Sequence, residues 1–91
     1  MSSPIRDNTA LARFELPADG AAALAYYRLA DGVITFTHTE APPQLRRRGF
    51  ASRLVHDALG AARARGLKVV PRCSFVANYI AQHPEFGDLL A

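Results

Sequence analysis

The stretch PPQLRRRGFASRLV, residues 42–55, decides how the chain is interpreted, because the pattern of side chains changes within it. Two prolines end strand pairing, three arginines and a glycine follow, and an apolar helical period begins at Ala51. A basic loop ahead of a helix has three candidate uses: a solvated surface run, a contact with a nucleic-acid backbone, or a pocket for a phosphorylated cofactor. The rest of the chain has to decide between them.

Downstream of this loop, apolar residues recur with helical spacing. They predict a helix from Ala51 to about Arg65, followed by Gly66 as a natural residue after its C-terminus. The side chains that this pattern places on the buried face are Ala51, Leu54, Val55, Ala58, Leu59 and Ala62.

The C-terminal third of the chain predicts a strand and a second helix. LKVV (67–70) is a short apolar run between a glycine and Pro71, which is typical of a buried strand. Ser74 is a suitable N-cap, and His83-Pro84 either ends or kinks the helix. Its expected apolar face is Phe75, Val76, Tyr79 and Ile80.

Upstream of the loop, the pattern indicates strands joined by tight turns. Residues 11–16 alternate with Ala12, Phe14 and Leu16 on one side, and the runs 21–29 and 33–41 are further strand candidates. Ala-Asp-Gly occurs at 18–20 and again at 30–32, and Asp-Gly is a strong hairpin signal. The first half is therefore expected to be a three-stranded antiparallel meander.

The predicted order is β-β-β-α-β-α. A helical crossover makes the third and fourth strands parallel neighbours, so the fold class is α+β, or α/β-like, with a mixed sheet in which the meander is followed by α-β-α. With 91 residues the chain is expected to hold one domain, residues 10–91, after a flexible N-terminus over 1–9.

Composition narrows the classes of function. The net charge of +3 favours anionic ligands but is weaker than in most DNA-binding domains. The single cysteine, Cys73, cannot form an internal disulfide, which fits a reducing compartment. The chain shows no run of about 18 apolar residues and no signal-peptide core, so a cytoplasmic protein without a membrane partner is expected.

The basic loop has the physical features of a phosphate site. A helix that starts at Ala51 presents unpaired N–H groups and a partial positive charge to an anion. Gly49 allows the backbone to approach a ligand closely, and a guanidinium can hold a phosphate with two hydrogen bonds. Nucleic acid is not expected, because the flanking strands provide no basic groove.

The spacing Arg46-x-x-Gly49-x-Ala51 resembles the acetyl-CoA signature of the GNAT acetyltransferase superfamily. The resemblance covers residues 12–90 and is closest to the small, single-domain, YjdJ-like branch, with a minimal GNAT fold. Two residues depart from that pattern: Arg47 stands where a glycine is usual, and Ala41 replaces a larger apolar residue. The other matching features are His38-Thr39, Pro71, Cys73 and His83-Pro84-Glu85-Phe86.

The resemblance implies a pose for acetyl-CoA. Backbone N–H groups of the loop would hold the pyrophosphate, and the pantetheine arm would lie where the third and fourth strands splay apart. N–H groups near the end of the third strand would stabilise the developing oxyanion. The implied cofactor-binding residues are Thr39, Glu40, Ala41, Arg46, Arg47, Arg48, Gly49, Phe50 and Ala51.

Three side chains are candidates for catalysis. Cys73 precedes a helix N-terminus, where a thiolate is stabilised, and is either a nucleophile, a lining residue or a small core residue. His38 lies at a strand end, on the side of Ile34 and Phe36, and could take the proton of an attacking amine. Tyr79 stands where many GNAT enzymes place a tyrosine that protonates the leaving thiolate, but it also falls on the apolar face of its helix, where core packing is the simpler explanation.

The remaining histidines are not expected in the site: His56 is on a polar helix side, and His83 serves the helix end. No spacing indicates a metal site. The function expected is acetyl-CoA-dependent N-acetyl transfer to an unidentified amine of a small molecule or protein, with direct transfer favoured over an acetyl-Cys73 route. A non-catalytic CoA-binding or regulatory module is the alternative, and monomer and weak homodimer both stay open.

Overall fold

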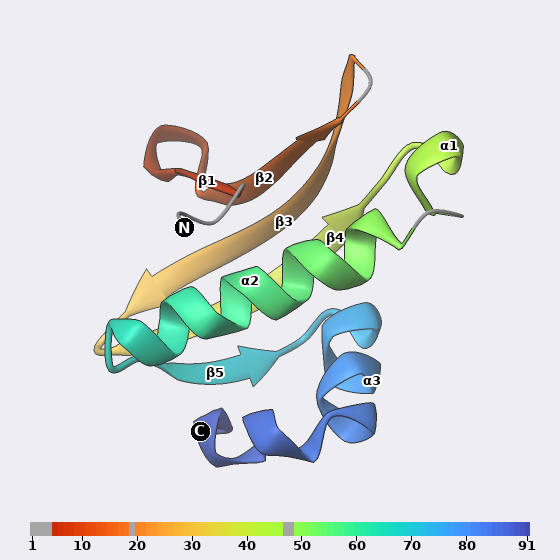
Figure 1. The fold of residues 1–91 in the computed structure, drawn as a ribbon. Helices are drawn as coiled ribbons and strands as arrows, with labels where there is room; N and C mark the ends of the chain where they lie inside the picture. Colours follow the sequence, from red (N-terminus) through yellow and green to blue (C-terminus); the bar gives the residue numbers. More distant parts are fainter. Residues whose placement is uncertain (1–4, 19, 47–48) are drawn as a thin grey trace.

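The computed structural model describes residues 5–18, 20–46 and 49–91 and, for Arg46, the backbone alone. The chain forms a mixed sheet of five strands in the order β1-β2-β3-β4-β5, and α2 lies across one of its faces (Figure 1). The predicted fold class is confirmed. The elements are β1 (Arg6–Asn8), β2 (Arg13–Ala18), β3 (Ala21–Ala30), β4 (Val33–Glu40), α1 (Pro43–Arg46), α2 (Phe50–Ala64), β5 (Lys68–Pro71) and α3 (Ser74–Gln82), with 3-10 turns at Thr9–Leu11 and Pro84–Leu89.

The predicted meander is present as β2, β3 and β4, which pair antiparallel. At the second turn Ala30 pairs with Val33, and Asp31 and Gly32 between them have φ angles of 54° and 75°. Two consecutive positive φ angles match the right-handed twist of a hairpin, which is why Asp-Gly is favoured there. The first turn likewise places Gly20 at a φ of 74°.

The long helix α2 builds the core. All six residues predicted for its buried face are buried. They pack against aromatic side chains of the sheet, where the ring of Phe14 lies 5.2 Å from that of Tyr27 and 6.2 Å from that of Phe36. After Gly66, with its φ of 70°, the chain returns as β5, parallel to β4 from Val33↔Lys68 to Phe36↔Pro71. The predicted crossover is thereby confirmed.

The N-terminal prediction is wrong in two places. Arg6–Asn8 belong to the expected flexible segment but form the edge strand β1, which pairs antiparallel with β2. The Tyr27 hydroxyl also donates to Asp7 at 2.5 Å. Leu11 does not begin a strand: it ends a 3-10 turn and is exposed, and β2 starts two residues later. The Asn8 side chain accepts a hydrogen bond from the Leu11 N–H, which stabilises this turn instead.

Three details of the helices also differ from expectation. Pro43–Arg46, expected to be loop, form the single-turn helix α1. Cys73, not Ser74, occupies the N-cap of α3, and no side chain caps this helix end. Phe75 is 37% exposed and does not belong to the buried face, which Val76, Tyr79 and Ile80 do form. Within the described ranges, no helix is both long and apolar enough to cross a membrane.

A β-bulge in β4 determines on which face of the sheet the last side chains of this strand lie. Phe36 pairs with Tyr27 and His38 pairs with Tyr26, so Thr37 is an extra residue without a counterpart on β3. Phe36 and Tyr27 are buried beneath α2, whereas Tyr26 is on the opposite face. The prediction that His38 shares a face with Ile34 and Phe36 is therefore wrong, because the bulge inverts the alternation.

Candidate active site

The two parallel strands separate at the C-terminal end of β4. The last pair of the β4–β5 ladder is Phe36↔Pro71, and the backbone N–H of Cys73 then donates to the Phe36 carbonyl at 3.0 Å. β4 itself continues to Glu40, while the chain after β5 turns into α3. The edge of β4 from Thr37 to Glu40 therefore has no strand partner on its β5 side among the described residues.

Cys73 and Thr39 meet across this opening. The Cys73 sulfur lies 3.3 Å from the Thr39 hydroxyl, and the cysteine is half-buried. Burial alone would raise the pKa of the Cys73 thiol. In the structure the Cys73 thiol donates to the Thr39 hydroxyl. The Thr39 side chain, followed by the backbone at Val76 and Phe75, favours the thiolate, outweighs burial and lowers the pKa of Cys73 below its ordinary value. The first turn of α3 therefore lies close enough to the sulfur to favour its charged form, although no side chain makes a cap hydrogen bond there.

Two hollows meet at Phe75 beside this opening. The first, of about 220 Å³, is lined by Phe75 together with four residues that the sequence predicted for cofactor binding, namely Thr39, Glu40, Ala41 and Ala51. The second, of about 210 Å³, is lined by Phe75, Ser52, Asn78, Tyr79 and Gln82. Together they border the opening, the start of α2 and the side of α3.

Ser52, Phe75, Asn78 and Gln82 were missed by the sequence-based prediction. Phe75 has the spacing of a core residue, and no pattern in the sequence distinguishes it from Val76 beside it. Only the packing of α3 shows that its ring remains exposed.

The start of α2 fits an anionic ligand. Gly49 is the N-cap with a φ of 74°, no side chain caps this end, and the first turn holds no acidic residue. A Cβ added to Gly49 would have no heavy atom within 4 Å, so the backbone is open here. The first-turn N–H groups and the positive helix end are thus presented outward. Of the three arginines, Arg47, Arg48 and the side chain of Arg46 lie outside the described residues.

His38 does not point at the sulfur of Cys73. Its side chain is 60% exposed on the outer face of the sheet, where its ring stacks on Tyr26 at 6.0 Å. Its Nε2 lies 3.1 Å from a carboxylate oxygen of Glu40. A neutral imidazole that donates this Nε2–H to the carboxylate keeps a lone pair on Nδ1, which is then the atom able to accept a proton.

Tyr79 is a neutral phenol at the edge of the second hollow. Burial, followed by the negative charges of Glu85 and Asp57, raises its pKa above the ordinary value for tyrosine. The ring of His83 stacks on the Tyr79 ring at 4.0 Å, and the His83 backbone N–H donates to the Ile80 carbonyl at the C-cap of α3. The Tyr79 hydroxyl has no hydrogen-bond partner among the described residues, so it remains available to a ligand.

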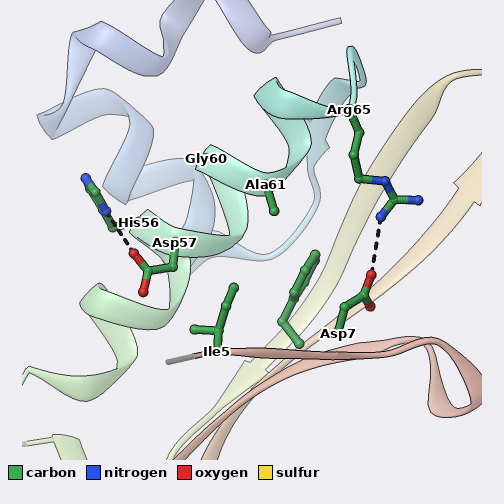
Figure 2. A pocket seen from close by; sticks show the side chains of 8 residues that line it. Ile5, Asp7, His56, Asp57, Gly60, Ala61 and Arg65 are labelled. Atoms are coloured by element: carbon green, nitrogen blue, oxygen red, sulfur yellow. Dashed lines mark hydrogen bonds and ion pairs between the residues drawn. The ribbon is translucent and has the colours of Figure 1, made fainter. Parts of the chain in front are cut away.

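A larger hollow, of about 530 Å³, lies elsewhere, between α2 and the β1–β2 edge (Figure 2). Apolar Ile5, Phe14 and Ala61 form much of its lining, and the Arg65 guanidinium at its rim already pairs with Asp7 at 3.2 Å. His56, also at this hollow, hydrogen-bonds Asp57. This hollow is not the candidate active site despite its size, because the charge of its arginine is balanced by Asp7 and none of the predicted catalytic residues lines it.

Comparison with known proteins identifies a matching family and a similar solved structure. A family model described as GCN5-related N-acetyl-transferase matches residues 13–89. Among solved structures, the chain is similar to the NMR solution structure of "a GCN5-like putative N-acetyltransferase from Staphylococcus aureus", with a TM-score of 0.74 and 25% sequence identity over 100% of this chain and 91% of that one. No curated protein matches the chain with significance.

Proposed function

The chain belongs to the family of GCN5-related N-acetyltransferases, and on that premise we propose that it transfers the acetyl group of acetyl-CoA to an amine. The observation that carries the proposal is the placement of the uncapped α2 start, with Gly49 at a φ of 74°, next to the opening at the end of β4. Ala51 from the helix and Thr39 from the strand line one hollow, so one elongated ligand can contact both.

Binding would be divided between these two places. The first turn of α2 supplies N–H donors and positive potential for a pyrophosphate. The exposed ring of Phe75 lies between the two hollows and offers an apolar surface to the pantetheine arm. The free edge of β4 from Thr37 to Glu40 supplies backbone groups to a carbonyl in the opening.

Proton transfer would be carried out by two side chains on different sides of the opening. Acetyl-CoA supplies an activated thioester, and the amine forms its new C–N bond as the C–S bond breaks. His38 Nδ1 would take the proton from the amine on the outer face, where Glu40 orients the ring. Tyr79, kept neutral by its raised pKa, would give a proton to the departing sulfur.

Binding is tested by thermal unfolding of the wild-type chain with acetyl-CoA. At a ligand concentration about 100 times the Kd, the folded state gains about 2.7 kcal/mol. For a domain of this size that corresponds to a rise in Tm of roughly 10–20 °C. Absence of any rise at saturating acetyl-CoA would overturn the proposed function.

Turnover is tested by release of free CoA thiol and by intact-protein mass spectrometry. Direct transfer predicts CoA release only when an amine is present, and no stoichiometric, hydroxylamine-sensitive acetylation of Cys73 with acetyl-CoA alone. Rapid acetylation of Cys73 that an added amine discharges would make the cysteine the nucleophile. Binding without CoA release for any amine would instead assign the chain as a CoA-binding module.

A further inference from the structure

The outer face of the sheet, opposite α2, holds a hollow that the reaction as proposed does not use. It measures about 450 Å³. Arg28 on β3 stands opposite Thr35 on β4, and Arg72 follows the end of β5. The residues that line this arginine hollow are Arg28, Ala30, Val33, Thr35, Thr37 and Arg72.

The two arginines of the hollow carry uncompensated charge. Both are exposed, and neither forms an ion pair with any residue in the described part of the chain. By contrast, Arg63 pairs with Asp88 and Arg65 pairs with Asp7. The Thr37 hydroxyl donates to the Tyr26 carbonyl at 3.5 Å, so the two guanidinium groups are the main donors of the hollow. Their positive charge and paired N–H groups suit a carboxylate or a phosphate.

The arginine hollow lies next to the proposed reaction site and on the side of its base. Arg72 immediately precedes Cys73, and Thr37 is the bulged residue immediately before His38. The distance of the hollow from Thr39 follows from a strand rise of about 3.3 Å per residue. Thr37, at the near end of the hollow, is roughly 7 Å from Thr39, and Thr35, farther along β4, is about 13 Å from it. An acceptor held here can therefore present an amine to the opening from the outer face.

We propose that the arginine hollow binds an anionic group of the acceptor, so that the enzyme selects amines whose molecule carries a carboxylate or phosphate about 7–13 Å from the nitrogen. This inference rests on the proposed function and specifies its substrate class. The spacing suits a lysine in an acidic peptide segment. A polyamine is disfavoured, because its additional positive charges would face Arg28 and Arg72.

The test uses three capped peptides of equal length, each with one lysine flanked by two glutamates, two glutamines or two phosphoserines. We expect kcat/KM for the glutamate peptide to exceed that for the glutamine peptide about three- to tenfold at low salt, a range set by two exposed charge pairs. The excess should shrink as salt screens these pairs. The phosphoserine peptide distinguishes phosphate from carboxylate as the preferred anion.

Substitutions of the two arginines test whether the preference for the glutamate peptide arises in the arginine hollow. Arg28→Gln and Arg72→Gln should each reduce the glutamate-to-glutamine ratio of kcat/KM, and the double variant should bring it to about one. Arg6→Gln is the matched control, because Arg6 is exposed on β1 at the opposite edge of the sheet and should leave the ratio unchanged. Equal kcat/KM for the glutamate and glutamine peptides in the wild type would overturn the inference and leave the proposed function standing.

A binding measurement decides the case in which no peptide is acetylated. The glutamate peptide is titrated into ¹⁵N-labelled protein saturated with CoA, and the amides of Thr35, Thr37 and Arg72 should shift. If these amides stay unchanged, the inference is wrong. If single-stranded DNA shifts them at physiological salt and displaces the peptide, the hollow is a nucleic-acid site and the inference is also wrong.

Discussion

Replacing Gly49 by alanine separates the stability of α2 from its proposed role in binding. Gly49 and Gly66 stand at the two ends of this helix with φ angles of 74° and 70°, and a Cβ at either would have no heavy atom within 4 Å. Neither substitution therefore causes a clash, and the cost of each is backbone strain of about 1–2 kcal/mol. In a domain of this size both variants should lose roughly 5–15 °C in Tm without ligand.

The two variants should differ when acetyl-CoA is added. Gly66→Ala should keep the ligand-induced rise of the wild type, because it lies at the far end of α2. Gly49→Ala should lose most of it, because its Cβ would project into the open space that a phosphate needs to reach the first-turn N–H groups. Gly49→Asn is a third variant: asparagine tolerates a positive φ, so stability should largely return while the ligand-induced rise stays small.

Differential scanning fluorimetry at matched acetyl-CoA concentrations measures all three variants. If Gly49→Ala and Gly66→Ala show the same ligand-induced rise, the cradle is not at the start of α2. If Gly49→Asn restores both stability and binding, close backbone approach is not required and the argument from the missing Cβ fails.

Further predictions concern chemistry and stability. In CoA-release assays Cys73→Ser should keep turnover with a loss of about tenfold, which is roughly 1.4 kcal/mol, whereas an undetectable rate would contradict direct transfer. His38→Ala should lose on the order of 10²-fold in kcat, partly recovered at high pH where free amine accumulates. The hydrogen bond from Arg63 lowers the pKa of Asp88 in the folded chain. Ionised Asp88 therefore stabilises the fold at pH values above its pKa in the unfolded chain, and this stabilisation is lost as pH falls through its pKa in the folded chain. The free energy of unfolding in urea should therefore vary less with pH for Arg63→Ala than for the wild type below about pH 4. Leu54→Ala should lower the free energy of unfolding by about 2–5 kcal/mol in urea, because this side chain is fully buried.

The sequence predicts those parts of the fold that local patterns control. The face of α2 follows from apolar spacing alone, and the turn at Asp31-Gly32 follows from two residues that accept positive φ angles. β1 was not predictable in this way. Its three residues are polar, and they form a strand by pairing with β2, supported by a hydrogen bond that Asp7 accepts from Tyr27, 20 positions away. Burial, followed by this contact with Asp7, raises the pKa of Tyr27 to about 12.

The sequence names candidate site residues but not how they are arranged, and their roles stay predictions. Thr39, Ala41 and Ala51 do line one hollow, because the end of β4 and the start of α2 are joined by a short connection. The side chain of Arg46, as well as Arg47 and Arg48, lies outside the described residues, and their roles stay predictions. The YjdJ-like branch and the amine acceptor stay predictions as well.

The bulge at Thr37 has the largest consequence for chemistry, and no glycine or proline in β4 signals it. Strict alternation would put His38 on the inner face and Thr39 on the outer face. The extra residue reverses this, so Thr39 contacts the Cys73 sulfur and His38 stacks on Tyr26. A cysteine nucleophile is commonly activated by a histidine within hydrogen-bond reach, and this fold places His38 on the other face. The thiolate would then depend on Thr39 and the α3 N–H groups alone. His38 instead stands where an amine would approach from the arginine hollow, and this separation favours direct transfer over an acetyl-cysteine route.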